Sequence, residues 1–194
     1  MWAAGWVDWS AAPANTNTAY LTQEKYSVVA AYLEHRASVF KCPADIYLSP
    51  IQQRLGWKGR IRSYSQVMGV GDGNAVQGLL PPIYGQAKKI SDLIIPGPAE
   101  TFVYLDEHAD SINDAAFFPP PSGSWSDLPA AYHNGADGFG FADGHAEMHR
   151  WSQSLAGPAT AKVRYNFTLV AAKTGDRDLH WFSYHSVRLS EKSY

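Results

Sequence analysis

The sequence predicts an α+β fold, with one helix near the N-terminus and short antiparallel strands joined by long loops. Three observations lead to this prediction: a helical apolar stripe over residues 26–35, a β-branched and aromatic run at 101–105, and two alternating segments around an Asp-Gly pair at 143–144. The chain of 194 residues suits a single domain over 1–194 with a hydrophobic core of its own.

The predicted helix runs from Tyr26 to His35. Apolar side chains at positions 26, 29, 30 and 33 follow the spacing i, i+3, i+4 and i+7, which places them on one face of a helix. Thr22 is expected to cap its N-terminus.

Short strands and loops are predicted for the rest of the chain. The run TFVYL (Thr101–Leu105) is typical of a buried strand, and glycines punctuate residues 50–82 as turns and short strands. The proline-rich segment Phe117–Ser126 is expected to be an exposed, stiff loop. Further strands are predicted at Val163–Val170 and Leu179–Val187.

A β-hairpin is the clearest local prediction. Asp143-Gly144 lies between two alternating segments and favours a two-residue type I′ turn, because both central residues then need positive φ. Directly opposed residues share a face of the hairpin. That register places Phe139, Phe141, Ala146 and Met148 on the core face and His145, Glu147 and His149 on the other face.

Composition excludes several classes of protein. The formal net charge is −2 and no run of Lys and Arg occurs, which argues against a nucleic-acid binder. No apolar stretch approaches the roughly 18 residues of a membrane span. No signal peptide follows Met1, so we expect either a cytoplasmic chain or one whose upstream segment has been removed. Cys42 is the single cysteine, so no intrachain disulfide forms, and it is expected to be a small buried hydrophobe.

Two groups of polar side chains are candidates for metal binding. The first follows the strand at 101–105 and offers five oxygen-bearing side chains within nine residues, which suits calcium. The second alternates along one strand, and an H-x-E-x-H pattern there can ligate a transition metal. Solvated polar surfaces without metal are the alternatives. The calcium candidates are Asp106, Glu107, Asp110, Asn113 and Asp114, and the transition-metal candidates are His145, Glu147 and His149.

A family resemblance rests on several segments. His133 is followed ten positions later by Asp143-Gly144, giving H-x9-DG within PAAYHNGADGFGFADGHAEMHRW. Similar segments are FKCPAD (40–45), RSYS (62–65), TFVYLDEHADSIND (101–114) and the tail around 178–181. Together they resemble a large family of bacterial pilin-like proteins that is named for its prepilin-type cleavage sites.

The resemblance implies a pilin-like head, in which an N-terminal helix packs on an antiparallel sheet, as in type II secretion pseudopilins. It also implies an extracellular or cell-envelope location and other pilin-like subunits as partners. The sequence carries neither the processing motif nor the long apolar helix of such proteins. The head domain is therefore expected without its N-terminal helix.

We expect a structural or surface-binding module, stabilised by calcium if a metal is present. Two alternatives remain open, each with surface polysaccharide as the partner. One is a carboxylate-based hydrolase of the glycosidase kind. The other is a carbohydrate-binding module without turnover. The candidate catalytic residues are Asp106, Glu107, His133, Asp143 and His145, with Glu147 as a further carboxylate, and the candidate sugar-stacking residues are Trp6, Trp9 and Trp125.

His133 itself has two interpretations. It precedes the turn dipeptide Asn134-Gly135, so it can simply fix that loop by hydrogen bonding to backbone. It can instead join Asp143 and His145 at one metal or catalytic centre.

Overall fold

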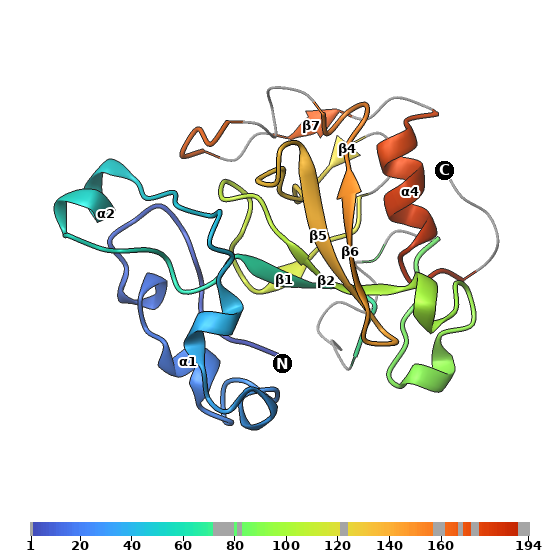
Figure 1. Ribbon diagram of the computed structural model, residues 1–194, viewed down its shortest axis with the longest axis horizontal. Helices are drawn as coiled ribbons and strands as arrows, with labels where there is room; N and C mark the ends of the chain where they lie inside the picture. Colours follow the sequence, from blue (N-terminus) through green and yellow to red (C-terminus); the bar gives the residue numbers. More distant parts are fainter. Residues whose placement is uncertain are drawn as a thin grey trace.

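A five-stranded sheet forms the centre of the molecule (Figure 1). The computed structural model describes residues 2–71, 80, 83–120, 124–156, 162–166, 169–171 and 175–189. The strand order is β3-β1-β2-β5-β6. β1 and β3 run parallel, whereas the other neighbours are antiparallel, so the α+β class is confirmed but the sheet is mixed. The strands are β1 (Tyr64–Val67), β2 (Phe102–Asp106), β3 (Ala116–Phe117), β5 (Ala136–Phe141) and β6 (Ala146–Arg150).

The predicted strand at 101–105 is confirmed as β2. Its register with β5 places Leu105 opposite Phe139 and Tyr104 opposite Gly140. Because side chains alternate along a strand, Leu105 and Phe139 face the main core, whereas Tyr104 and Asp106 face the other side of the sheet.

The main core is covered by a second, two-stranded sheet of β4 (Ser124–Trp125) and β7 (Val170–Ala171) and by the helix α4 (Arg177–Tyr184). Phe182 of α4 is fully buried, with its ring centroid 4.8 Å from that of Phe102 and 5.2 Å from that of Trp125. Figure 1 shows α4 on one side of the sheet and the N-terminal segments on the other.

The helix α4 overturns the strand that was predicted at Leu179–Val187. Asp176 caps the helix, because its carboxylate accepts hydrogen bonds from the backbone N–H groups of Asp178 and Leu179. Leu179, Phe182 and Ser183 are buried at i, i+3 and i+4. Their apolar content suggested a strand, but their spacing is helical.

The helix predicted at Tyr26–His35 is also wrong. These residues form turns and one 3-10 turn at Ala31–Leu33, and the chain reverses at Glu34 and His35, whose φ angles are 51° and 55°. Ser27 is fully buried and donates its hydroxyl to the carbonyl of Trp2. Tertiary contacts therefore replace the regular helix, and residues 2–63 form only short helices, so the long N-terminal helix of a pilin-like head is not confirmed.

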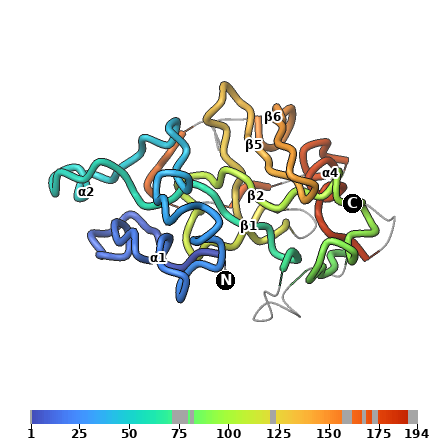
Figure 2. Tube along the Cα trace, turned by 60° about the horizontal axis from the view of Figure 1, so that its bottom comes forward, coloured from blue at the N-terminus to red at the C-terminus, as the bar shows by residue number. Residues whose placement is uncertain are grey.

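The N-terminal segment forms a second core against the opposite face of the sheet (Figure 2). The Trp2 indole donates to the carbonyl of Ala115 at 2.6 Å, and the Val7 amide donates to the carbonyl of Asn113 at 2.7 Å. Short helices complete this half: η1 (Pro13–Asn15), α1 (Ala19–Thr22), η2 (Ala31–Leu33), η3 (Ala37–Phe40) and α2 (Pro50–Arg54). Two more, η5 (Ile90–Asp92) and η6 (Pro98–Glu100), lie on the α4 side, where the Glu100 carbonyl contacts His185.

The hairpin of β5 and β6 exists, but its register differs from the prediction by one residue. Gly140 lies opposite Ala146 and Phe139 lies opposite Glu147, because the loop has three residues, 142–144, and not two. Gly144 has a φ of 97°, the left-handed position that such a loop needs. A shift of one residue moves every side chain of β6 to the other face. Phe139 and Phe141 are buried as predicted, yet Met148 is exposed on the side away from them.

Two further segments differ from expectation. In the proline-rich segment, Phe117 and Trp125 are fully buried and Pro119 and Pro120 are buried, so it is part of the core; residues 121–123 lie outside the described residues. The strand predicted at Val163–Val170 is reduced to its last residue, in β7, and residues 167–168 are not among those described. None of the helices in the described ranges is long and apolar enough to cross a membrane.

Candidate metal centre

A cleft of about 780 Å³ lies between the N-terminal segment and the open face of the sheet. Its floor includes Tyr104, Gly138 and Gly140, and its wall includes Leu33 and Phe40. The floor is low at the two glycines, and a Cβ at Gly138 would make ordinary van der Waals contact with a carboxylate oxygen of Asp106, at 3.8 Å.

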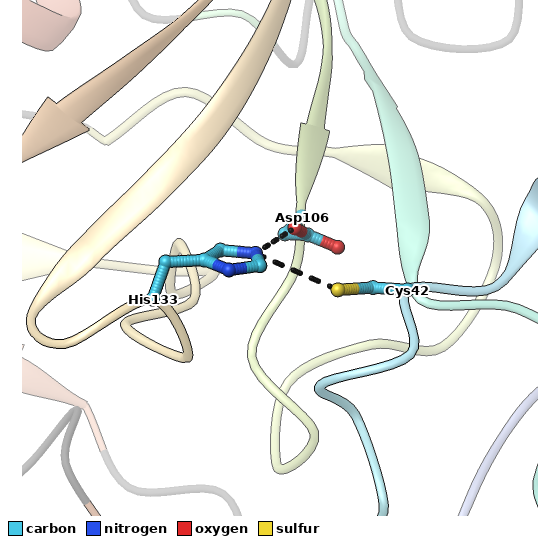
Figure 3. Close-up of side chains that lie close together, drawn as sticks. All are labelled: Cys42, Asp106 and His133. Atoms are coloured by element: carbon cyan, nitrogen blue, oxygen red, sulfur yellow. Dashed lines mark hydrogen bonds and ion pairs between the residues drawn. The ribbon is translucent and has the colours of Figure 1, made fainter.

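Three side chains that carry metal-binding atoms meet in the lining of this cleft: Cys42, Asp106 and His133 (Figure 3). The Nε2 atom of His133 lies 3.5 Å from Cys42 Sγ and 3.2 Å from Asp106 Oδ2. All three ligand atoms lie within 4.8 Å of one another. In the described part of the chain, no other three or more His, Cys, Asp or Glu side chains converge in this way.

Each ligand comes from a different part of the fold. Cys42 follows η3, and its amide donates to the Ser63 hydroxyl beside β1. Asp106 ends β2 opposite Tyr64, and strand alternation turns it toward the cleft. His133 lies in the turn before β5, where its amide and carbonyl both bond to Ala136.

The three side chains do not form a nucleophilic triad. In such a triad the nucleophile contacts one ring nitrogen and the carboxylate holds the other, whereas here both partners approach Nε2. Burial raises the pKa of the Cys42 thiol, and the nearby Asp106 raises it further. A thiol with a raised pKa is a poor nucleophile.

The donor set suits a borderline transition metal such as zinc. A thiolate, an imidazole and a carboxylate are zinc ligands, whereas calcium takes oxygen atoms only. Burial raises the pKa of Asp106 to about 6, and the hydrogen bond from His133 opposes that shift. The other carboxylate oxygen of Asp106 is buried, with no hydrogen-bond partner among the described residues. A cation at this point would neutralise that carboxylate. The cluster can therefore hold a metal ion.

The five residues predicted to bind calcium do not come together. Glu107 points away from Asp106 and accepts a 2.5 Å hydrogen bond from Ser65 in the interior. Asp110 accepts from the Trp9 indole, and the other two cap local turns, which their short polar side chains favour. The members that separate in this way are Glu107, Asp110, Asn113 and Asp114, and Asp106 alone reaches the cluster.

The ligand atoms of the H-x-E-x-H residues do not converge on one point either. His145 pairs with Asp143 at 2.6 Å on the exposed hairpin tip and stacks on Phe141. His149 stacks on Trp181 instead, with ring centroids 3.7 Å apart. Glu147 borders the cleft, but it lies opposite Phe139, which turns its side chain to the other face of the sheet, and it is not part of the cluster.

The predicted stacking residues have different surroundings. Trp125 is fully buried in the main core. Trp6 is 55% exposed, and Trp9 is half-buried, with the Arg60 guanidinium 4.0 Å from its ring centroid. Trp6 and Trp9 both line a smaller cavity of about 340 Å³ that also includes Asp8, Asp110, Asn113 and Asp127.

Two of the three residues of the cluster are candidates from the sequence, and the third is not. Asp106 and His133 were candidates, whereas Cys42 was assigned only a packing role. It is indeed buried, at 2% exposed. The one signal for it was its place in FKCPAD, one of the segments that carry the family resemblance. No protein-family model, curated protein or solved structure matches the chain.

Proposed function

We propose that this chain is a pilin-like structural or surface-binding module, at the cell surface or in the envelope. Its cleft is the binding surface, and a metal ion at Cys42, Asp106 and His133 fastens the N-terminal segment to the sheet. The ion is a zinc-class metal in place of the calcium expected at first, because the donors include sulfur and nitrogen.

One observation carries the proposal: segments far apart in the sequence meet at a single place. Cys42 lies in FKCPAD, Asp106 in TFVYLDEHADSIND, and His133 opens H-x9-DG. Tyr64, from RSYS, lines the same cleft. Four of the segments on which the resemblance rests therefore contribute to one site.

A metal ion at this point links segments that are far apart in the sequence. Cys42 and His133 are 91 positions apart, and Asp106 and His133 are 27 apart. A metal bound only in the folded state stabilises that state by mass action. It would also convert the Cys42 thiol to thiolate, so binding releases a proton.

The first prediction concerns metal binding. Zinc at 100 times its dissociation constant should raise the stability of the metal-free chain by about 2.7 kcal/mol. Differential scanning fluorimetry, with zinc, calcium and then EDTA, measures this as a rise in Tm with zinc alone that EDTA reverses. Cys42→Ser and His133→Ala should each remove most of the rise.

His145→Ala is the matched control, because His145 is an exposed histidine that pairs with Asp143 outside the cluster. It should keep the full zinc response. An equal rise in wild type and Cys42→Ser would contradict the proposed site.

A second candidate function is carbohydrate binding at the smaller cavity. The Trp6 ring is more than half exposed, and carboxylate and amide groups lie beside it, the combination that recognises sugar rings. Trp9 supports the cavity wall, because Arg60 and Tyr165 already occupy its ring.

The second prediction follows from these positions. Trp6→Ala should abolish binding in a glycan-array or fluorescence titration without lowering Tm. Tyr32→Ala is the control, since Tyr32 is an aromatic residue that is 87% exposed and lies outside this cavity. If Trp6→Ala binds glycans as well as wild type does, this cavity is not a sugar site.

A further inference from the structure

We propose that the metal at Cys42, Asp106 and His133 binds the head group of an apolar monocarboxylate, whose tail lies in the adjoining cleft. The inference rests on the proposed metal site and adds the class of ligand that this site takes.

The first argument is coordination. A zinc-class ion takes four ligands in a tetrahedron, and the cluster supplies three. All three ligand residues line the cleft, so the fourth position is reached from it. The His133 side chain is 35% exposed, which keeps the site accessible to a ligand. Three protein ligands and an open position distinguish a ligand-binding metal from a closed structural one.

The second argument is the chemistry of the cleft. Its volume of about 780 Å³ falls within the range of small-molecule sites. Beyond the metal cluster, the described side chains that face the cleft are aliphatic or aromatic apart from the hydroxyl groups of three tyrosines. Trp2, Val29, Leu33 and Phe40 form one side, and Met148 lies on the other. A linear or aromatic hydrocarbon tail would be removed from water along this surface.

The third argument is charge. The carboxylate that faces the cleft is that of Asp106, and no lysine or arginine is among the described residues that line it. An acid that entered the metal-free cleft would meet like charge and no cation. The bound metal is the positive group that can receive it, so acid binding should depend on metal.

The cleft has an apolar rim through which such a ligand can enter. Tyr32 is 87% exposed, Met148 55% and Val39 44%, and all three line the cleft. The apolar lining therefore indicates a hydrocarbon tail, whereas the metal indicates a carboxylate head group.

Cobalt(II) in place of zinc makes the site visible, because a cobalt–thiolate bond gives a charge-transfer band and tetrahedral cobalt gives visible d–d bands. The cobalt-loaded chain should show both, and Cys42→Ser should lose the charge-transfer band. Titration with hexanoate, octanoate and decanoate should shift the d–d bands. Affinity should rise about fourfold per methylene, or about 15-fold from hexanoate to octanoate.

Control experiments distinguish the contribution of the carboxylate head group to binding from that of the hydrocarbon tail. Octanol, which lacks the acid, should leave the d–d bands unchanged, and the metal-free chain should not bind octanoate in calorimetry. Met148→Asp should weaken octanoate binding more than tenfold while the cobalt bands without ligand stay as in wild type. Ile94→Asp changes an apolar residue that is 78% exposed outside the cleft, and it should bind octanoate normally.

The outcomes are distinguishable. If the cobalt bands form but no acid shifts them, the ligand inference is overturned and the metal site stands. Equal affinities for hexanoate and decanoate would overturn the role of the cleft. If no cobalt spectrum forms, the metal site of the proposed function fails and the ligand inference fails with it.

Discussion

At the scale of the residue, several carboxyl groups in or near the interior have raised pKa values. Burial raises the pKa of Glu107 and of Asp137 well above the usual range, and raises that of Asp127 to about 7. Asp114 raises the pKa of Asp127 further, while the Phe118 amide, which donates to it at 2.6 Å, opposes the shift. The folded protein therefore holds a proton on Asp127 at a pH where the unfolded chain has lost it.

This proton gives the third prediction. As pH rises from about 4 to about 7, the unfolded chain ionises at Asp127 before the folded protein does, so folding loses stability over that interval and no more above it. Asp127→Asn removes this loss and keeps an oxygen for the Phe118 amide. The Tm of the variant minus that of wild type should be smallest near pH 3, grow through pH 6 and level off above pH 7.5. A difference that is the same at every pH would refute the assignment.

Single residues also set the limit of sequence reasoning about the site. Asp106 and Glu107 look equivalent as neighbouring acids, yet strand alternation sends one to the cleft and the other to Ser65 in the interior. That alternation was predictable from the strand. The partners were not, because Cys42 has no second cysteine or histidine at ligand spacing to indicate a metal site.

At the scale of the element, the hairpin explains both the success and the error of prediction. Asp143-Gly144 located the reversal correctly, and Phe139 and Phe141 are buried. The loop length decides the register, and a loop of three residues with Gly144 in the left-handed region is compatible with the same sequence. That one residue turned His145, Glu147 and His149 toward the phenylalanine side and put Met148 on the cleft side.

The fourth prediction tests this loop. Gly144→Ala should destabilise the fold by about 1–2 kcal/mol, because alanine resists a φ of 97° although no atom lies within 4 Å of its Cβ. Gly97→Ala is the matched control: its Cβ is equally unobstructed, but its φ is −71°. Urea unfolding should give a clear loss for the first variant and no loss for the second. Equal effects would mean that the conformation at Gly144 is not what matters.

Local sequence signals were misleading for one helix and sufficient for another. The apolar spacing at 26–35 was helical, but a buried Ser27 hydroxyl and a left-handed reversal at Glu34 and His35 replaced the helix by turns. In α4 the helical spacing and the Asp176 cap were both present in the sequence. The Asp176 cap together with this spacing predicts a helix, whereas the apolar content alone suggests a strand.

At the scale of the whole molecule, local patterns predicted the class and the long-range contacts did not follow from them. The strand at 101–105, the hairpin and the α+β class are confirmed. The parallel pairing of β1 with β3, the second core and the cleft depend on segments that meet across the chain, and no periodicity in a single segment encodes such meetings. The cluster of Cys42, Asp106 and His133 belongs to this second group, with members up to 91 positions apart.

The packing of the N-terminal segment has a consequence for biosynthesis. Trp2 bonds to a residue 113 positions later, and the amide of Val7 bonds to Asn113. At typical translation speeds of about 5–20 residues per second, this segment waits roughly 6–23 s after leaving the ribosome before its partners emerge. During that interval the partners of Trp2 and Val7 are missing, so this segment should depend on a chaperone more than the residues near 115 do.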